Sequence, residues 1–329
     1  MVVDLFQEFQ SKRILVLGDV MLDSYLIGDV TRISPEAPVP VVNLVKKEDR
    51  LGGAANVALN IVALGAEAIL CSVIGEDWEA KQLMSLVRTQ SISFEGIVQS
   101  TDRKTTVKTR ILGHNQQLLR IDSEHVHPIS EEEECALIQR VSSLLKTGID
   151  AIIFQDYNKG VLTPRVIQHV IALAHKFNVP TTVDPKKDNF FEYKGVTLFK
   201  PNLKELKEGL NIAFDIVDKE AFELAVAMLE ERIGNKITFI TLSEHGVFIK
   251  SHENKSYIPA HVRNIADVSG AGDTVISVAT LCLTVGLAIE KIAAYANLAG
   301  GMVCEKSGVV SIEKEQFHAE IVRLDKQLN

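Results

Sequence analysis

The sequence has few cysteines, no long apolar run and no excess of basic charge. Its four cysteines lie far apart without a C-x-x-C pair, so we expect reduced core residues instead of disulfides or a zinc site. The longest uncharged run, Thr274–Ile289, is too short and too rich in threonine and serine for a membrane span. Met1–Phe9 lacks the basic start of a signal peptide. These features predict a cytoplasmic protein with no membrane partner.

Other function classes lose support through missing motifs. The net charge is −8, and no basic run exceeds Lys46-Lys47 or Lys186-Lys187, so nucleic acid is not an expected partner. No H-E-x-x-H, G-x-S-x-G or G-x-x-x-x-G-K-[ST] motif is present, which argues against zinc hydrolysis, serine hydrolysis and P-loop chemistry. A nicotinamide dehydrogenase is the rival class, but Gly18–Met21 lacks the glycines that let a pyrophosphate approach the first helix.

The pattern of apolar residues predicts alternating strands and helices along most of the 329 residues. The expected strands are Arg13–Gly18, Ala68–Ile74, Ala151–Phe154, Thr181–Val183, Val196–Phe199 and Ile237–Thr241. The main expected helices are Gly52–Leu64, Glu79–Thr89, Glu131–Lys146, Pro164–Phe177, Leu203–Leu210, Lys219–Glu231 and one that begins near Thr274. This order predicts a single α/β domain over residues 1–329, built on a doubly wound, mostly parallel sheet.

Two stretches, roughly residues 20–50 and 93–122, have β-prone segments and no helix. The first is interrupted by Gly28 and three prolines, which suits edge strands or a separate small sheet. The second contains the alternating segments Phe94–Val98, Thr105–Ile111 and Gln117–Ile121. We expect both stretches to form one small β-sheet lid over an edge of the main sheet.

Charged residues follow several of the predicted parallel strands. The six strand ends are Gly18-Asp19, Ile74-Gly75, Gln155-Asp156, Asp184–Lys186, Lys200–Asn202 and Thr241–Ser243. Four of these six carry charge, and ligands of such sheets bind beyond the carboxyl ends of the strands. The sequence therefore predicts a ligand site on this rim.

Asp267–Asp273 (DVSGAGD) runs directly into an apolar helix. Gly270, Ala271 and Gly272 can turn their backbone N–H groups toward one point at the positive end of the helix dipole, which makes an anion site. Asp273 lies in the same turn and is expected to stay ionised. This arrangement suits phosphoryl transfer to an alcohol, with Asp273 accepting the proton of the attacking hydroxyl. An ordinary loop–helix junction with an acidic first turn would have the same residues.

Asp19 and Asp23 follow the first strand, and Gly53 and Asn56 lie at the start of the next helix. Carboxylates accept hydrogen bonds from neighbouring sugar hydroxyls, and an asparagine amide can bind a ligand. The alternative is structural. Both aspartates would then bond to nearby backbone N–H groups, and Asn56 would lie on the helix surface.

Lys108 and Arg110 alternate along one predicted strand, so their side chains share a face. On a lid over a sugar site, they and Lys186 could bind a phosphate group of the substrate. Solvated surface charge is the alternative for each.

Asn202, Leu203, Lys204 and Glu205 occupy a strand-to-helix turn that could contact nucleotide phosphates, with Glu205 holding Mg²⁺ through water. A simple helix cap made by Asn202 and Glu205 explains the same residues.

Together these motifs resemble the PfkB/ribokinase family of sugar kinases. Gly52–Ala58 (GGAANVA) matches its N-terminal signature and Asp267–Asp273 its C-terminal signature, and the resemblance covers nearly the whole chain. It implies a ribokinase-like fold, ATP and Mg²⁺ as cofactors, Asp273 as the catalytic base and an anion hole made by the amides of Gly270–Gly272. It also implies an ATP site at Asn202–Glu205, Ser243, Gly246 and Asn297, and a sugar site at Asp19, Asp23, Gly53 and Asn56. Ser269 replaces the usual threonine but keeps the hydroxyl.

Within this family, Arg32–Pro40, Asn115–Leu118 and Asp184–Lys186 resemble the heptose 7-phosphate kinases. That likeness implies phosphorylation of the anomeric C1 hydroxyl of D-glycero-D-manno-heptose 7-phosphate to the 1,7-bisphosphate, in the synthesis of ADP-heptose for the lipopolysaccharide core. It also implies a homodimer formed through the lid. A related kinase of ribose, fructose phosphate or a nucleoside, or a catalytically silent sugar-binding regulator, is an alternative. The chain resembles a stand-alone kinase or a fragment of a bifunctional enzyme.

Overall fold

The computed structural model describes residues 2–114, 116–252, 254–261 and 263–328. Asn115, part of one predicted subgroup motif, lies outside the described residues. The main sheet has strand order β13-β12-β11-β10-β9-β8-β1-β4-β5, in which the strands from β11 to β5 are parallel. Its strands are β1 (Arg13–Gly18), β4 (Glu67–Gly75), β5 (Ser93–Ser100), β8 (Ala151–Gln155), β9 (Thr181–Asp184), β10 (Leu198–Phe199), β11 (Ile237–Thr241), β12 (Val247–Ser251) and β13 (Asn254–Ile258).

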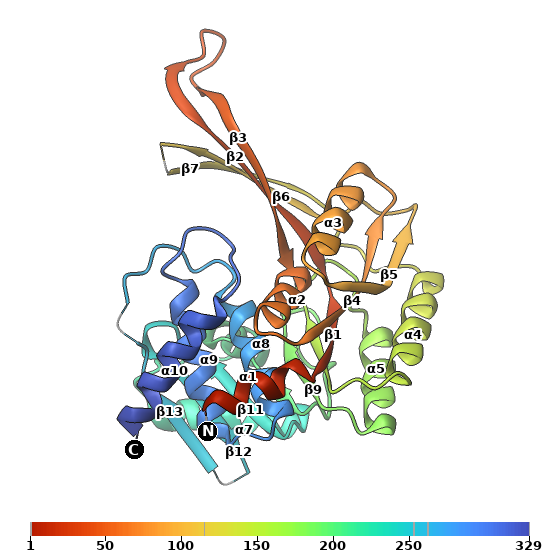
Figure 1. Cartoon of the computed structure of the whole chain (residues 1–329), viewed down its shortest axis with the longest axis vertical. Helices are drawn as coiled ribbons and strands as arrows, with labels where there is room; N and C mark the ends of the chain where they lie inside the picture. Colours follow the sequence, from red (N-terminus) through yellow and green to blue (C-terminus); the bar gives the residue numbers. More distant parts are fainter. Residues whose placement is uncertain (1, 115, 253, 262, 329) are drawn as a thin grey trace.

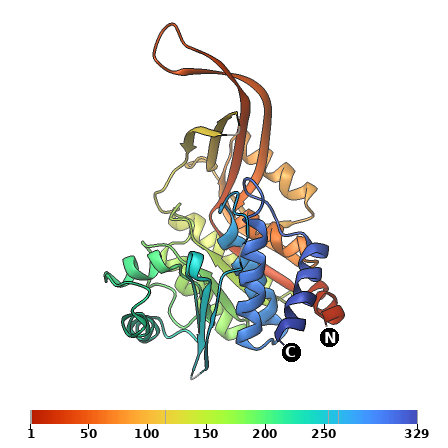
Figure 2. The ribbon, with the colours of Figure 1, turned by 90° about the vertical axis from the view of Figure 1, so that its left-hand side faces the viewer.

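Helices cover both faces of this sheet (Figure 2). One apolar core contains residues of α1 (Val2–Gln10), α2 (Ala54–Ala63), α3 (Trp78–Thr89), α8 (Ala271–Thr284), α9 (Ile289–Val303) and α10 (Lys314–Leu328). The other contains residues of α4 (Glu131–Leu145), α5 (Pro164–Phe177), α6 (Leu203–Leu210) and α7 (Lys219–Ile233). Because both faces are covered, β1 is a nearly continuous aliphatic run, as expected for a central parallel strand. The predicted doubly wound α/β fold is confirmed.

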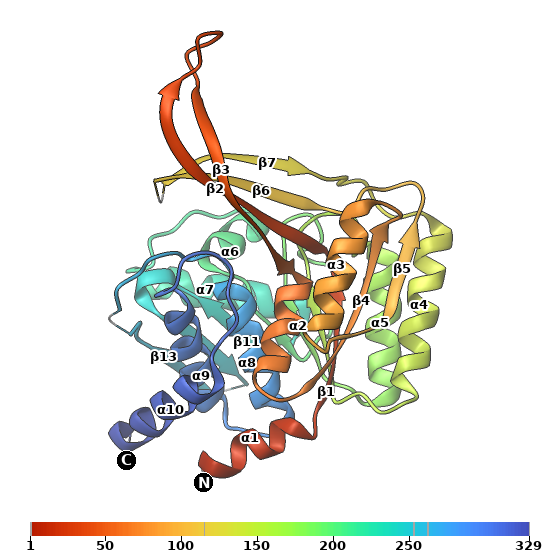
Figure 3. The same cartoon turned by 45° about the horizontal axis from the view of Figure 1, so that its top comes forward.

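A second sheet has the order β3-β2-β6-β7 and projects from the body of the protein as a lid (Figures 1 and 3). We define the lid as β2 (Val20–Ile33), β3 (Pro40–Gly53), β6 (Val107–Gly113) and β7 (Gln116–Ser123). Two of its strands are longer than the short segments expected from the sequence. The prolines that interrupted the pattern lie in the turn between β2 and β3 and at the first residue of β3, where the missing N–H is tolerated.

One part of the predicted lid belongs elsewhere. Residues 93–100 form β5, which pairs with β4 at the edge of the main sheet, and not with the lid. Alternation alone does not tell which sheet a strand joins. The consecutive buried residues Gly96, Ile97 and Val98 show a strand covered on both faces. A side chain at Gly96 would collide with the sulfur of Cys71.

The carboxyl ends of the parallel strands converge on the side of the sheet below the lid (Figure 3). Within the described residues, no helix combines the length and apolar character needed to cross a membrane. Cys71 and Cys282 are buried as expected, but Cys135 is exposed; none of the four cysteines forms a disulfide.

Candidate active site

The N-terminus of α8 lies at the centre of the site. Gly270 caps the helix with φ of 81°, a left-handed conformation that glycine adopts without strain. Among the described residues, the backbone N–H groups of Gly270, Gly272 and Asp273 have no acceptor, whereas Ala271 donates to the carbonyl of Val268 at 3.3 Å. The N–H of Ala271 is thus already paired, and an anion hole made by the amides of Gly270–Gly272 stays a prediction. The three unpaired N–H groups are at the positive end of the helix dipole.

Asp273 lies in the first turn of α8 and is only 3% exposed. Its Oδ2 accepts from Asn56 Nδ2 at 2.8 Å, and its Oδ1 accepts from the Tyr157 hydroxyl at 2.8 Å and Gln155 Nε2 at 3.1 Å. Burial raises the pKa of Asp273 to about 7, although the bonds from Asn56 and Tyr157 oppose this. That Asp273 stays ionised was expected from its place in the turn, and this stays a prediction. A pKa of about 7 is close to the working pH at which a general base is effective.

A cluster of charges flanks the first turn of α8. Asp184 pairs with the buried Lys200 at 3.1 Å, and Lys186 pairs with Glu205 and lies 3.9 Å from Asp184. Burial would raise the pKa of Asp184, but Lys200 and Lys186 outweigh it, and this pKa is lowered. A Cβ added at Gly272 would lie 3.4 Å from an Asp184 oxygen, so the cluster borders the anion site directly.

A cavity of about 410 Å³ adjoins the other side of this helix start. Of the predicted residues, it is lined by Ser243, Gly246, Ala271, Gly272 and Asn297. The remaining walls are largely apolar, as in most sites for small molecules. The structure therefore brings together residues from three distant parts of the chain that were predicted to bind a nucleotide.

Asn202–Glu205 do not line that cavity. Asn202 and Glu205 form a capping box at the start of α6, with the Asn202 side chain accepting from the Glu205 N–H and the Glu205 carboxylate accepting from the Asn202 N–H, both at 2.8 Å. Lys204 is exposed and pairs with Glu208. The structural alternative for Asn202 and Glu205 is thus confirmed, and a role of Asn202–Glu205 in binding phosphate stays a prediction.

The lid contributes the opposite wall. Asp23 on β2 is buried and forms an ion pair with Arg110 on β6. Lys108, two residues before Arg110, points its Nζ at the ring of Tyr157, 5.8 Å from the centroid. Burial and the nearby Lys159 lower the pKa of Lys108. Two of the predicted lid cations therefore lie beside Asp23 and above the residues that contact Asp273.

Asp19 and Gly53 shape the backbone beneath the lid. Both oxygens of Asp19 are occupied by backbone N–H groups of Tyr157, Lys159 and Val161, at 2.8 to 3.1 Å. The carboxylate predicted to hold sugar thus holds a loop in the structure, which is the structural alternative for this residue. Gly53 is the N-cap of α2 with φ of 58°, and it sets the first turn that carries Asn56.

Sequence reasoning missed three side chains at the site: Gln155, Tyr157 and Lys200. Gln155 and Tyr157 contact Asp273 across more than a hundred residues of sequence. Their only signal was their position at the end of β8, and for Lys200 at the end of β10.

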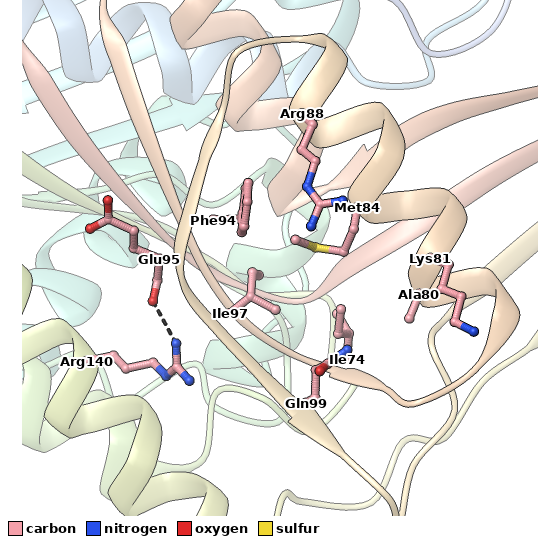
Figure 4. A pocket seen from close by; sticks show the side chains of 10 residues that line it. All are labelled: Ile74, Ala80, Lys81, Met84, Arg88, Phe94, Glu95, Ile97, Gln99 and Arg140. Atoms are coloured by element: carbon pink, nitrogen blue, oxygen red, sulfur yellow. Dashed lines mark hydrogen bonds between the residues drawn. The ribbon is translucent and has the colours of Figure 1, made fainter.

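A second cavity, of about 430 Å³, lies at the free edge of β5 between α3 and α4 (Figure 4). Arg88 packs over the ring of Phe94, and Arg140 donates to the Glu95 carbonyl at 2.8 Å. None of the predicted sugar or nucleotide residues lines it.

Comparison with known proteins identifies the class of enzyme. The pfkB family of carbohydrate kinases matches residues 11–315, and the chain belongs to this family. It is a phosphotransferase that acts on an alcohol group, and more narrowly a sugar kinase.

Among curated relatives, the chain is 41% identical to the bifunctional protein HldE of Methylobacillus flagellatus over 308 residues. This match covers 94% of this chain and 63% of the relative. The HldE of Wolinella succinogenes is 40% identical, with 90% and 61% covered. The chain thus spans less than two thirds of these relatives.

Solved structures confirm the fold. Phosphofructokinase-2 of Escherichia coli in complex with fructose-6-phosphate has a TM-score of 0.78 at 19% identity, covering 95% of this chain and 99% of that one. Arabidopsis thaliana ribokinase complexed with ribose and ATP has a TM-score of 0.72 at 15% identity, covering 95% and 98%. At these identities the likeness establishes the ribokinase-like fold alone.

Proposed function

We propose that this protein transfers the γ-phosphoryl group of ATP to the anomeric C1 hydroxyl of a heptose 7-phosphate, giving the 1,7-bisphosphate. The observation that carries the proposal is the position of Asp273 between two sites. On one side lies the cavity lined by Ala271 and Gly272, and on the other lie Asn56 and Tyr157 beneath the lid. A base at this junction can contact both an acceptor hydroxyl and a terminal phosphate.

Two buried oxygens beside Asp273, where the sugar is proposed to bind, have no hydrogen-bond donor among the described residues. Asn56 Oδ1 and Gln155 Oε1 are buried and have no partner among the described residues, although each amide nitrogen of these side chains bonds to Asp273. Burying an unpaired acceptor costs about 1–3 kcal/mol. Hydroxyl groups of a bound sugar would satisfy both oxygens, which supports a polyhydroxyl acceptor next to the base.

The proposed reaction moves one proton to Asp273 and one phosphoryl group from ATP to the sugar. Asp273 takes the proton of the C1 hydroxyl while that oxygen forms a bond to the γ-phosphorus, and the bond from phosphorus to the ADP oxygen breaks with its electron pair going to ADP. The unpaired N–H groups of Gly270, Gly272 and Asp273 stabilise charge on the transferring group. ATP would occupy the 410 Å³ cavity, and a cytoplasmic location would supply it.

The site offers Mg²⁺ one carboxylate, Glu205, and no cage of protein ligands among the described residues. The described residues contain no group of three or more His, Cys, Asp or Glu side chains suited to a metal. Mg²⁺ needs no such cage, since it is usually held by nucleotide phosphates and water with one or two carboxylates. Glu205 is already bonded to Asn202 and Lys186, which suits contact through water. Bound there, the ion would neutralise phosphate charge.

The substrate phosphate is proposed from the sequence likeness to heptose 7-phosphate kinases and from the cations near Asp23. Arg110 and Lys186 are each paired with a carboxylate, whereas Lys108 has no ion-pair partner among the described residues. Since burial already lowers the pKa of Lys108, a phosphate dianion beside it would stabilise its charged form.

We therefore expect Lys108→Ala to raise KM for the phosphorylated sugar about tenfold or more, because a charge-assisted bond to phosphate is lost. Arg110→Ala and Lys186→Ala should raise it less, and KM for ATP should change by about twofold at most. Steady-state kinetics measure this, with Lys46→Ala as the control, since Lys46 lies midway along β3 and its exposed side chain pairs with Glu48. An unchanged KM in all three variants would remove the case for a phosphorylated acceptor.

The test of the function itself is a panel of sugars and sugar phosphates with coupled detection of ADP. Phosphorus NMR of the product then shows which hydroxyl was phosphorylated. Turnover of ribose, fructose phosphate or a nucleoside in place of heptose 7-phosphate would select another kinase of the family. Sugar binding without turnover would indicate a silent regulator.

We further propose a homodimer formed through the lid. Its support is a set of exposed large apolar side chains on the lid strands, which isolated monomers seldom carry together. They are Ile33, Leu44, Val45, Leu118, Leu119 and Ile121.

The expected result is a dimer in sedimentation velocity at micromolar concentration. Val45→Lys combined with Leu119→Lys should weaken it about a hundredfold or more, since burying two unpaired charges is costly. Leu224→Lys, an equally exposed apolar position on α7, is the control. A wild-type protein that stays monomeric at every concentration contradicts the proposal.

A further inference from the structure

Tyr157 lies immediately beyond the end of β8, at the meeting point of the lid, the rim and the base. Its hydroxyl donates to Asp273 Oδ1 at 2.8 Å. Two cations lie near its ring, with Lys108 Nζ 5.8 Å and Lys186 Nζ 5.7 Å from the centroid. The residue therefore contacts groups from the lid, from the main-sheet rim and from α8.

The loop that carries Tyr157 is held by two buried carboxylates. Asp19 accepts the N–H groups of Tyr157, Lys159 and Val161. Asp156 accepts from the Asn158 N–H at 2.8 Å, and its other oxygen accepts from the Tyr193 hydroxyl at 2.7 Å. Because the backbone is fixed on both sides of Tyr157, the phenol is held in place before substrate binds.

The hydrogen bonds to Asp273 are unequal on its two oxygens. Oδ1 accepts from both Tyr157 and Gln155, while Oδ2 accepts from Asn56 alone. A carboxylate oxygen has two lone-pair sites, so Oδ1 is filled and Oδ2 keeps one site open. The open oxygen is the one that can receive a proton from the acceptor hydroxyl.

We propose that Tyr157 is a positioning residue for Asp273: it occupies Oδ1, turns the open lone pair of Oδ2 toward the acceptor and favours the ionised carboxylate. This inference rests on the proposed function, in which Asp273 is the base. It extends that function by giving a role to Tyr157, a residue that is not proposed to bind either the sugar phosphate or the nucleotide.

Electrostatics support this role. Burial and the nearby Asp273 and Asp184 hold the pKa of Tyr157 well above its usual value, so the phenol is a neutral donor at every working pH. The groups that face Asp273 from the surrounding elements are Asn56, Gln155, Tyr157, Asp184, Lys186 and Lys200. Asp184 raises the pKa of Asp273, whereas Lys200 and the bonds from Asn56 and Tyr157 lower it. Removing the phenol should therefore favour the protonated acid.

The test is the pH profile of kcat for Tyr157→Phe. In the wild type we expect the acid limb near the Asp273 pKa of about 7. In the variant it should move up by about one pH unit, lowering kcat about tenfold at pH 6 but less than about threefold at pH 9. A uniform loss of kcat at all pH values, with the limb unmoved, would overturn the proposal. Tyr295→Phe, which removes a phenol bonded to Asp325 away from the site, is the matched control and should leave the profile unchanged.

A second measurement does not depend on knowing the acceptor. Carbon-13 NMR of labelled aspartate in the substrate-free protein follows the Asp273 carboxyl, assigned by its loss in Asp273→Asn. Its pKa should rise in Tyr157→Phe and fall when 3-fluorotyrosine, a stronger donor of the same shape, replaces Tyr157. An unchanged titration in both proteins overturns the proposal even if the phenylalanine variant folds poorly. If no sugar is phosphorylated, the proposed function fails while this titration still tests Tyr157.

Discussion

We expect Asp273→Asn to lower kcat by about 10³-fold and to leave the affinity for ATP within about twofold. General-base catalysis contributes about 10²- to 10⁴-fold, and an amide cannot take the proton of the acceptor hydroxyl. The variant keeps the shape of the first turn of α8 and the unpaired N–H groups of Gly270 and Gly272. Steady-state kinetics and calorimetric titration with ATP measure the two quantities. Wild-type turnover with normal ATP binding would show that Asp273 is not the base.

The same variant should be more stable than the wild type at alkaline pH. Burial raises the pKa of Asp273 from 3.8 to about 7. The contribution of protonated Asp273 to the free energy of unfolding is therefore fully present below pH 3.8 and is lost as the pH rises through 7. At pH 8 the folded protein must therefore hold an unfavourable buried charge, which asparagine removes. The free energy of unfolding should rise by roughly 1–3 kcal/mol at pH 8, by about a third as much at pH 5, and not at all below pH 3.8.

This paired result separates a catalytic role from a structural one. A carboxylate kept only for its hydrogen bonds to Asn56, Gln155 and Tyr157 would make the variant less stable at both pH values. If the buried charge of Asp273 destabilises the folded protein but is needed for turnover, Asp273→Asn should instead lose activity and gain stability.

The fold could be predicted from local sequence patterns because those patterns reflect burial. The aliphatic runs of β1 and β8 are buried on both faces, and the capped, amphipathic α5 begins and ends where Thr163 and Asn178 place it. The choice of partner strand could not be predicted, since β5 alternates like a lid strand but pairs with β4. That choice depends on what covers each face in the folded protein.

The residues of the candidate site could be predicted where a glycine with a positive φ angle lies beside them. Gly270 and Gly53 adopt left-handed φ angles at helix starts, and such positions are visible as glycines next to Asp273 and Asn56. Tyr157 carries no such mark. Its hydrogen bond to Asp273 spans 116 residues and depends on how two strands and a helix meet. Single-sequence reasoning has no access to contacts of that range.

Replacing Lys200 should strongly lower the stability of the protein. Lys200 pairs with Asp184 at 3.1 Å and is 2% exposed. Lys200→Met should lower the free energy of unfolding by about 2–4 kcal/mol, since removing one partner of a buried ion pair leaves the other charge uncompensated. Lys186, 3.9 Å from Asp184, limits the loss. Denaturation with urea at pH 7 measures it. Lys204→Met, which breaks an exposed pair with Glu208, should cost less than about 0.5 kcal/mol and is the control.

A double-mutant cycle distinguishes loss of the pair from simple loss of packing. Asp184→Asn removes the stranded charge, so the double variant Lys200→Met/Asp184→Asn should be more stable than the sum of the single effects predicts, by about 2 kcal/mol. Additive effects would show that Lys200 stabilises the protein through its aliphatic stem alone. Coupling of the expected size would instead mean that the pair fixes the Asp184 carboxylate next to Gly272, where a free charge would compete with a phosphate for the start of α8.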